Sequence, residues 1–224
     1  EFWMSEEIEL ISLDGNLFGR MMTAMVTPFD EHLKIDFKAV DAVVEHLIKT
    51  GTTSIIVAGT TGESPTLEDD EKEALLKAVI AASNKRVKVI MGTGTNVTAK
   101  SIKATQKAES LGADGALVVA PYYNKPSQAG LLAHFSAIAQ SSSLPLIVYN
   151  IPARTGINIS CETMITLSKN EKTIHALKDS TGNVDQASDI AAAAREDFLV
   201  YSGDDNLTLP FLSIGASGVI SAAS

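Results

Sequence analysis

The sequence has few of the residues that mark disulfide-rich and metal-binding proteins. Its 224 residues include one cysteine, Cys161, so no intrachain disulfide is expected, and we interpret this thiol as a packing residue rather than a nucleophile. The four histidines, at positions 32, 46, 134 and 175, include no pair at ligand spacing on one helix. We therefore expect no metal site.

Long apolar runs and an excess of positive charge are also lacking. No apolar run approaches the roughly 20 residues that a membrane span requires, and the N-terminus has neither the basic region nor the apolar core of a signal peptide. The 18 Lys and Arg residues, against 27 Asp and Glu, leave a net charge of −9, which disfavours nucleic acid and anionic membranes as partners. These absences predict a soluble, cytoplasmic protein with neither partner.

The sequence does contain a regular alternation of two kinds of segment. Short apolar runs bounded by turn residues are separated by stretches with helical periodicity, such as Phe37, Val40, Val44, Leu47 and Ile48. This alternation implies parallel strand pairing through right-handed crossovers. It predicts an α/β protein, a (β/α)8 TIM barrel with helices between its eight strands. The predicted strands are 23–26, 54–58, 87–91, 116–120, 144–150, 173–178, 198–202 and 218–221.

A doubly wound open sheet is the main alternative architecture. Such a fold normally carries a glycine-rich nucleotide fingerprint after an early strand. The nearest match, residues 92–97, lacks the third glycine. We therefore favour the barrel and expect no cofactor.

The expected organisation is an N-terminal lead-in over residues 1–18 and one catalytic barrel domain over residues 19–224. The predicted eighth strand ends three residues before Ser224. We therefore expect a barrel that lacks its eighth helix. Such an uncovered wall is expected to destabilise the fold, because apolar surface worth about 25 cal/mol per Å² loses its cover.

Polar side chains close several predicted strands, at the end of a parallel barrel where active sites lie. Lys178 ends strand 173–178, and strand alternation places it on the same face as Ile174 and Ala176, the expected barrel interior. Partial desolvation there lowers the pKa of the amine and frees it to attack a carbonyl. The position alone equally allows a lysine that snorkels into solvent.

Three further features belong to the same expected mouth. Tyr149 shares its strand face with Ile147, and its phenol can exchange a proton with a carbinolamine oxygen, although buried tyrosines are more often structural. The turn 59–63 offers hydroxyls and backbone N–H groups that suit a small carboxylate, but it lacks the ending of a phosphate loop. Arg154 follows strand 144–150, where it is either a carboxylate ligand or simply solvated.

At these residues the chain resembles the dihydrodipicolinate synthase and N-acetylneuraminate lyase family of pyruvate-dependent class I aldolases. The resemblance runs from about residue 19 to residue 221, and the motifs occur in the family's order. It implies a TIM barrel that uses no metal for its chemistry. The motifs are Gly59–Ser64, Pro121–Pro126, Tyr149–Gly156, Leu177–Gly182 and Ser202–Asp205.

The resemblance implies four catalytic residues. Lys178 would form the imine with pyruvate, and Tyr149 would be the general acid and base at that carbon. Thr60 would link Tyr149 to Tyr123, which in the family reaches in from a neighbouring subunit. A homodimer or homotetramer is therefore expected.

The resemblance also implies four substrate-binding residues. Thr61 would hold the pyruvate carboxylate, while Gly203 and Ile220 would line the pocket. Arg154 would bind the carboxylate of aspartate semialdehyde, the second substrate, at the mouth.

The combination of Thr60 and Arg154 favours condensation of pyruvate with aspartate semialdehyde, giving 4-hydroxy-tetrahydrodipicolinate in lysine and diaminopimelate biosynthesis. Two alternatives stay open. One is another pyruvate-dependent lyase of the family, acting on N-acetylneuraminate or a 2-keto-3-deoxy sugar acid. The other is a truncated, catalytically silent barrel.

The chain differs from the family pattern in two places, and each difference leads to an expectation. Lysine-inhibited members often have two histidines and a glutamate where this chain has Asp69, Lys72 and Lys100, so we expect weak or absent inhibition by lysine. The family's C-terminal helical region has no counterpart before Ser224. The sequence therefore indicates the family of this chain more strongly than it indicates its activity.

Overall fold

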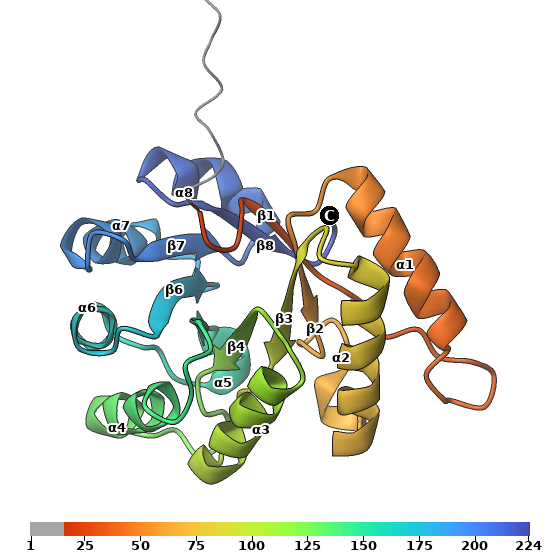
Figure 1. The fold of residues 1–224 in the computed structure, drawn as a ribbon. Helices are drawn as coiled ribbons and strands as arrows, with labels where there is room; N and C mark the ends of the chain where they lie inside the picture. Colours follow the sequence, from red (N-terminus) through yellow and green to blue (C-terminus); the bar gives the residue numbers. More distant parts are fainter. Residues whose placement is uncertain (1–15) are drawn as a thin grey trace, which may run out of the picture.

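Eight parallel strands close into a barrel in the computed structural model of the chain, which describes residues 16–224 (Figure 1). Each strand pairs with the next, and β8 pairs with β1. The prediction of a TIM barrel is confirmed, and the open sheet is excluded. All but the last three residues of the predicted lead-in lie outside the described part. The strands are β1 (Met21–Ala24), β2 (Ser54–Val57), β3 (Lys88–Gly92), β4 (Gly115–Val119), β5 (Leu146–Asn150), β6 (Ile174–Asp179), β7 (Leu199–Ser202) and β8 (Gly218–Ser221).

A helix follows each of the first seven strands and lies outside the barrel (Figure 1). A one-turn helix, α5 (Pro152–Thr155), and two 3₁₀ turns, η2 (Ser64–Thr66) and η3 (Asp205–Leu207), sit in the connections after β5, β2 and β7. No helix follows β8 before Ser224. The outer helices are α1 (Phe37–Thr50), α2 (Asp69–Ser83), α3 (Thr98–Ser110), α4 (Gln128–Ala139), α6 (Cys161–Asn170), α7 (Val184–Ala193) and α8 (Thr208–Ser213).

Local sequence signals explain where these helices begin and end. In α1 the Asp36 side chain accepts hydrogen bonds from the first free N–H groups, and Gly51 ends the helix in the left-handed conformation. The predicted periodicity is confirmed at Val40, Val44 and Leu47, which are buried. Phe37, the first residue of the helix, is 43% exposed.

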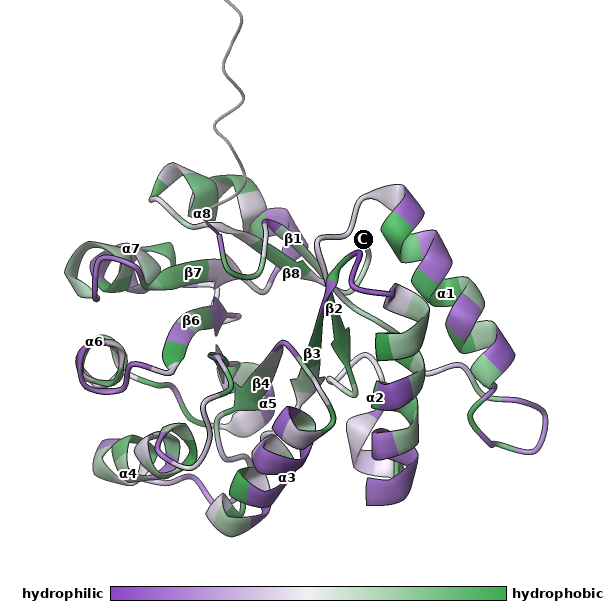
Figure 2. Cartoon of the chain, viewed as in Figure 1, coloured by the Kyte–Doolittle hydropathy of each residue, from purple (hydrophilic) through white to green (hydrophobic). Residues whose placement is uncertain are grey.

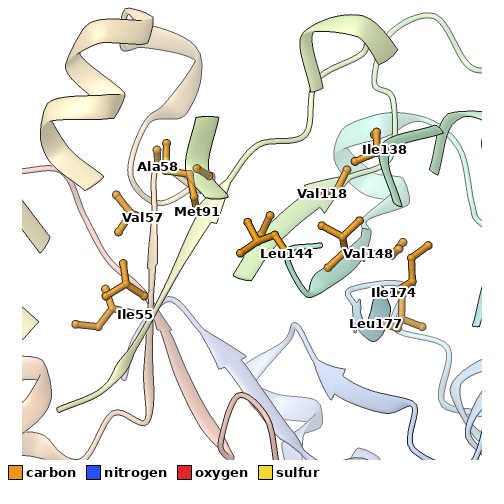
Figure 3. Close-up of a cluster of buried hydrophobic side chains, with 14 of the residues drawn as sticks. Ile55, Val57, Ala58, Met91, Val118, Ile138, Leu144, Val148, Ile174 and Leu177 are labelled. Atoms are coloured by element: carbon orange, nitrogen blue, oxygen red, sulfur yellow. The ribbon is translucent and has the colours of Figure 1, made fainter. Parts of the chain in front are cut away.

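The larger apolar core lies between the barrel and its ring of helices. Outward-facing strand residues such as Ile55, Val118 and Leu177 belong to this core together with helix residues such as Ile138. In Figure 3, Val118 lies near Ile138. The strands are accordingly hydrophobic along their lengths, and the helices carry hydrophilic residues on their outer faces (Figure 2). This is the pattern expected for parallel strands buried on both faces. Among the described helices, none is both long and apolar enough to cross a membrane.

A second, smaller apolar cluster fills the inside of the barrel. Met22, Ile56, Ile90 and Leu117 belong to it, and Phe18 closes the end where the strands begin. Gly115 makes room for this ring, since a Cβ atom there would lie 2.9 Å from Phe18 Cε1. Side chains therefore fill the interior at the end where the strands begin, and the active site is expected at the C-terminal ends of the strands.

One strand departs from simple alternation. Opposite β5, the register of β6 shifts so that Leu146 pairs with Ile174 but Ile147 pairs with Ala176, which leaves His175 as an extra residue. Ile174 therefore packs in the outer core and Ala176 inside the barrel. The prediction that Ile174 shares the interior face is wrong, whereas the interior position of Ala176 is confirmed.

Candidate active site

Lys178 and Tyr149 lie side by side at the C-terminal mouth of the barrel. They end neighbouring strands, β6 and β5, and are direct partners in the parallel register. Lys178 Nζ lies over the Tyr149 ring, 4.4 Å from its centroid. The amine thus lies against the face of the ring, so a carbon bound to the amine would lie close to the tyrosine as well.

The Lys178 side chain is removed from water. The residue is 7% exposed, and burial lowers the pKa of its amine to about 8, while the negative charges of Asp204 and Asp205 partly oppose that shift. At neutral pH about a tenth of the amine is therefore uncharged. An uncharged lysine amine at a barrel mouth is a nucleophile for a carbonyl carbon.

The Tyr149 phenol is buried as well. Burial raises its pKa, whereas the Ser180 hydroxyl, the Arg154 charge and the Thr60 hydroxyl act in the opposite direction. The Ser180 hydroxyl favours the phenolate form of Tyr149. Ser180 Oγ itself is buried and forms no hydrogen bond with any of the described residues. The two hydroxyls and the positive charge of Arg154 thus all lower the pKa of the phenol, against the effect of burial.

Gly203 leaves space for the side chains of Ser180 and Lys178. It follows β7, and its N–H donates to the Asp179 carbonyl at 2.7 Å. A Cβ atom there would lie 2.0 Å from Ser180 Oγ and 3.0 Å from Lys178 Cε. Only glycine leaves these side chains in place. Ile220, on β8, is fully buried in the same interior cluster as Tyr149.

The turn after β2 forms one rim of the mouth. Its chain direction reverses between two residues in the left-handed region, Ala58 with φ 50° and Glu63 with φ 55°. Thr27 Oγ1 anchors the turn by donating to the Gly62 carbonyl at 2.7 Å. Thr60 is exposed at the rim and Thr61 is half-buried.

Beside Tyr149 the mouth holds a cavity of about 280 Å³. Thr60, Tyr149 and Arg154 line it, and Arg154 reaches it from α5. Its size suits a small organic acid better than a nucleotide, because pockets for drug-sized ligands begin near about 300 Å³. Lys178, Thr61, Gly203 and Ile220 do not line this cavity directly.

Tyr123 stands apart from the other predicted site residues. It is 89% exposed and has φ 74°, a conformation that costs energy in a residue with a bulky side chain. Its neighbour Tyr122, not Tyr123, lines the cavity of this chain. The structure of one chain therefore does not bring Tyr123 to its own site.

Sequence reasoning did not single out two residues beside the amine, Ser180 and Asp204. Ser180 lies two residues after Lys178, so strand alternation could have placed it on the same face. Asp204 follows Gly203 on another strand end, and its effect on the pKa of Lys178 depends on the contact between β6 and β7. No signal local to the sequence reveals that contact. Within residues 16–224 no three His, Cys, Asp or Glu side chains come together as a metal site.

Comparison with known proteins adds an independent line of evidence. The Dihydrodipicolinate synthetase family matches residues 17–224. A 4-hydroxy-tetrahydrodipicolinate synthase of Halalkalibacterium halodurans is 52% identical, with 92% of this chain and 70% of the relative covered. The Bacillus subtilis 4-hydroxy-tetrahydrodipicolinate synthase is 50% identical, with 92% and 71% covered.

Solved structures agree with these relatives. A crystal structure of dihydrodipicolinate synthase from Bacillus anthracis is similar to this chain with a TM-score of 0.90 and 51% identity. The match covers 92% of this chain and 70% of that one. The chain thus spans about 70% of the length of the proteins that it resembles.

Proposed function

We propose that this chain, which belongs to the dihydrodipicolinate synthetase family, condenses pyruvate with aspartate semialdehyde through an imine on Lys178. The observation that carries the proposal is the buried Lys178 amine, with its pKa lowered to about 8, held over the Tyr149 ring at the barrel mouth. The names of the relatives support the substrates. The product would be 4-hydroxy-tetrahydrodipicolinate.

The first half of the reaction consumes pyruvate. The uncharged Lys178 amine attacks the keto carbon, and the carbinolamine that forms loses water to give the imine. The imine is held in its protonated form, and loss of a proton from the methyl carbon then gives the neutral enamine. Burial favours these steps, because it holds part of the amine uncharged and makes the loss of charge less costly.

The second half forms the carbon–carbon bond. The enamine carbon attacks the aldehyde, and the amino group of the semialdehyde then attacks the imine carbon. Ring closure displaces Lys178 and regenerates its amine, so that one water is released per turnover. The positively charged Arg154 at the cavity would hold the carboxylate of the semialdehyde through its planar fork.

Tyr149 would move the protons of both halves. The amine lies over its ring, and the Thr60 and Ser180 hydroxyls lower the pKa of its phenol. A hydroxyl relay of this kind supplies typically 10²- to 10⁴-fold in rate. Thr60 would continue the relay to Tyr123 of a neighbouring subunit in a homodimer or homotetramer, while Thr61 would hold the pyruvate carboxylate beside Gly203 and Ile220.

The test is borohydride trapping with pyruvate, followed by peptide mapping of the adduct. We expect the adduct on Lys178 and none in Lys178→Arg, whereas the exposed Lys125→Arg serves as the matched control and should trap like the parent. A folded sample without any adduct would contradict the imine. A coupled assay with aspartate semialdehyde then tests the second substrate, and pyruvate release from N-acetylneuraminate or a 2-keto-3-deoxy sugar acid instead would contradict the condensation.

A further inference from the structure

The segment that carries Arg154 leaves the barrel at the end of β5. It runs from Ile151 to Asn158 and contains α5, a helix of four residues. A single helical turn is only marginally stable by itself, so other contacts must hold it. Arg154 lines the active-site cavity, and it forms no salt bridge among residues 16–224. The position of its guanidinium group therefore depends on the backbone of this segment.

The Asn150 side chain joins the two ends of the segment. Asn150 ends β5 and is 1% exposed. Its Nδ2 donates to Asn158 Oδ1 at 2.8 Å and to the Ile159 carbonyl at 3.3 Å, and its Oδ1 accepts from the Ile159 N–H at 3.1 Å. All the side-chain hydrogen bonds of this buried amide thus go to residues 158 and 159. We call these contacts the Asn150 clamp.

Two helices of the outer ring anchor the far end of the segment. On α7, Gln186 Nε2 donates to the Ile159 carbonyl at 3.2 Å, and Gln186 Oε1 accepts from Asn158 Nδ2 at 2.8 Å. On α4, Gln128 Nε2 donates to the Asn158 carbonyl at 2.8 Å, and Gln128 Oε1 accepts from the Ser160 N–H at 3.1 Å. The clamp is therefore fixed to the ring of helices as well as to its own strand.

Other contacts are internal to the segment. Thr155 is buried, and its Oγ1 lies 3.0 Å from both the Ile151 and the Ile157 carbonyl oxygens. The Arg154 N–H donates to the Ile151 carbonyl at 3.0 Å. These bonds fix the shape of the turn, whereas its place on the barrel depends on the Asn150 clamp.

We propose that Asn150 is a positioning residue for Arg154 and so sets the affinity for the second substrate without touching it. This inference rests on the proposed function, in which Arg154 binds the carboxylate of aspartate semialdehyde. Asn150 does not line the active-site cavity, and strand alternation turns it away from the interior that Tyr149 faces. A guanidinium group binds a carboxylate through two parallel hydrogen bonds, so a small displacement of its backbone weakens both of them.

Steady-state kinetics of Asn150→Ala test the proposal. We expect the KM for aspartate semialdehyde to rise about tenfold, because the displaced guanidinium group holds the carboxylate less well. The KM for pyruvate and the borohydride trapping of pyruvate on Lys178 should stay within about twofold of the parent, since neither involves Arg154. Gln186→Ala, which removes an outer anchor at a half-buried position, should raise the KM for the semialdehyde about threefold.

The matched controls remove comparable contacts at the other end of the barrel. Ser54→Ala deletes a buried hydroxyl that donates to the Phe18 carbonyl. Gln106→Ala deletes a helix amide that donates to the Ser141 carbonyl. Both should leave the KM for the semialdehyde within about twofold of the parent, which separates a loss of stability from a loss of position. Melting curves verify that every variant folds.

A double variant shows whether Asn150 acts through Arg154. In Arg154→Ala the carboxylate has lost its partner, so the addition of Asn150→Ala should change the KM for the semialdehyde by less than about twofold. A further rise of the full size would overturn the proposal, as would an unchanged KM in folded Asn150→Ala. If Asn150→Ala does not fold, an unchanged KM in Gln186→Ala overturns it instead. Trapping of pyruvate by the parent without any turnover of the semialdehyde would refute the proposed condensation and this role together.

Discussion

Two opposing effects act on the Lys178 amine. Burial lowers its pKa, and the carboxylates of Asp204 and Asp205 raise it again. The pKa of Asp204 is itself raised, first by its own burial and then by Asp205, while Lys178 lowers it. The reactivity of the amine therefore depends first on its burial and then on two carboxylates of the connection that follows β7.

We expect the rate of imine trapping with pyruvate to rise about tenfold per pH unit at low pH and to level off above a pH of about 8. Asp204→Asn removes a charge that raises the pKa of Lys178, so the plateau should begin at a lower pH and trapping at neutral pH should be faster. Asp185→Asn, exposed on α7, is the control. A profile that moves to higher pH in Asp204→Asn would contradict the assignment.

At the scale of elements, α3 and α4 meet through a buried histidine. His134 on α4 is 5% exposed, its Nδ1 lies 2.9 Å from Thr98 Oγ1 on α3, and its Nε2 is buried with no partner among the described residues. Burial alone lowers the pKa of His134 to about 4. The helix pair therefore accepts only the neutral ring.

Folding stability should consequently fall in acid. An unfolded histidine titrates near 6.5, so between about pH 6.5 and 4 the unfolded chain binds more protons and the free energy of unfolding decreases as the pH drops. The loss amounts to about 2 kcal/mol at about pH 5. Urea unfolding at about pH 7.5 and 5 measures it.

His134→Gln should reduce this pH dependence, because glutamine does not titrate. His46→Gln, at an exposed position on α1, should leave it unchanged. If the free energy of unfolding falls in acid as much in both variants as in the parent, another group is responsible.

At the scale of the whole molecule, the proposed function places the exposed Tyr123 in the site of a neighbouring chain. It does not line the cavity of its own chain, and its strained backbone holds a large aromatic side chain in solvent. Such strain persists only where the surrounding structure enforces it and often marks a functional segment.

A mixing experiment tests this arrangement. Tyr123→Ala and Lys178→Ala chains, inactive or weak alone, should together form sites that combine one chain's lysine with the other's tyrosine. We expect coexpressed chains to show several times the summed activity of the two variants. Thr60→Ala with Lys178→Ala is the control, because both residues serve one chain's site and no complete site can form. Activity no greater than the sum in both mixtures would contradict action across chains.

The sequence by itself determined the number of strands, the closed barrel, and the inward direction of Lys178 and Tyr149. The strand count and the inward direction of the two side chains follow from local periodicity, since side chains alternate along a strand. The closed barrel was favoured over an open sheet because the nucleotide fingerprint is missing and the family motifs lie at strand ends. The same alternation failed at Ile174, because the extra residue in β6 depends on its register with β5. A bulge of this kind has no local signature in the chain.

Only the tertiary structure decided the surroundings of the amine. The close packing of Gly203 against Ser180 and Lys178, and the charge of Asp204 beside the amine, arise where separate strands meet. Distances between segments far apart in the sequence set burial and electrostatic fields, and these set the pKa values on which the proposed chemistry depends.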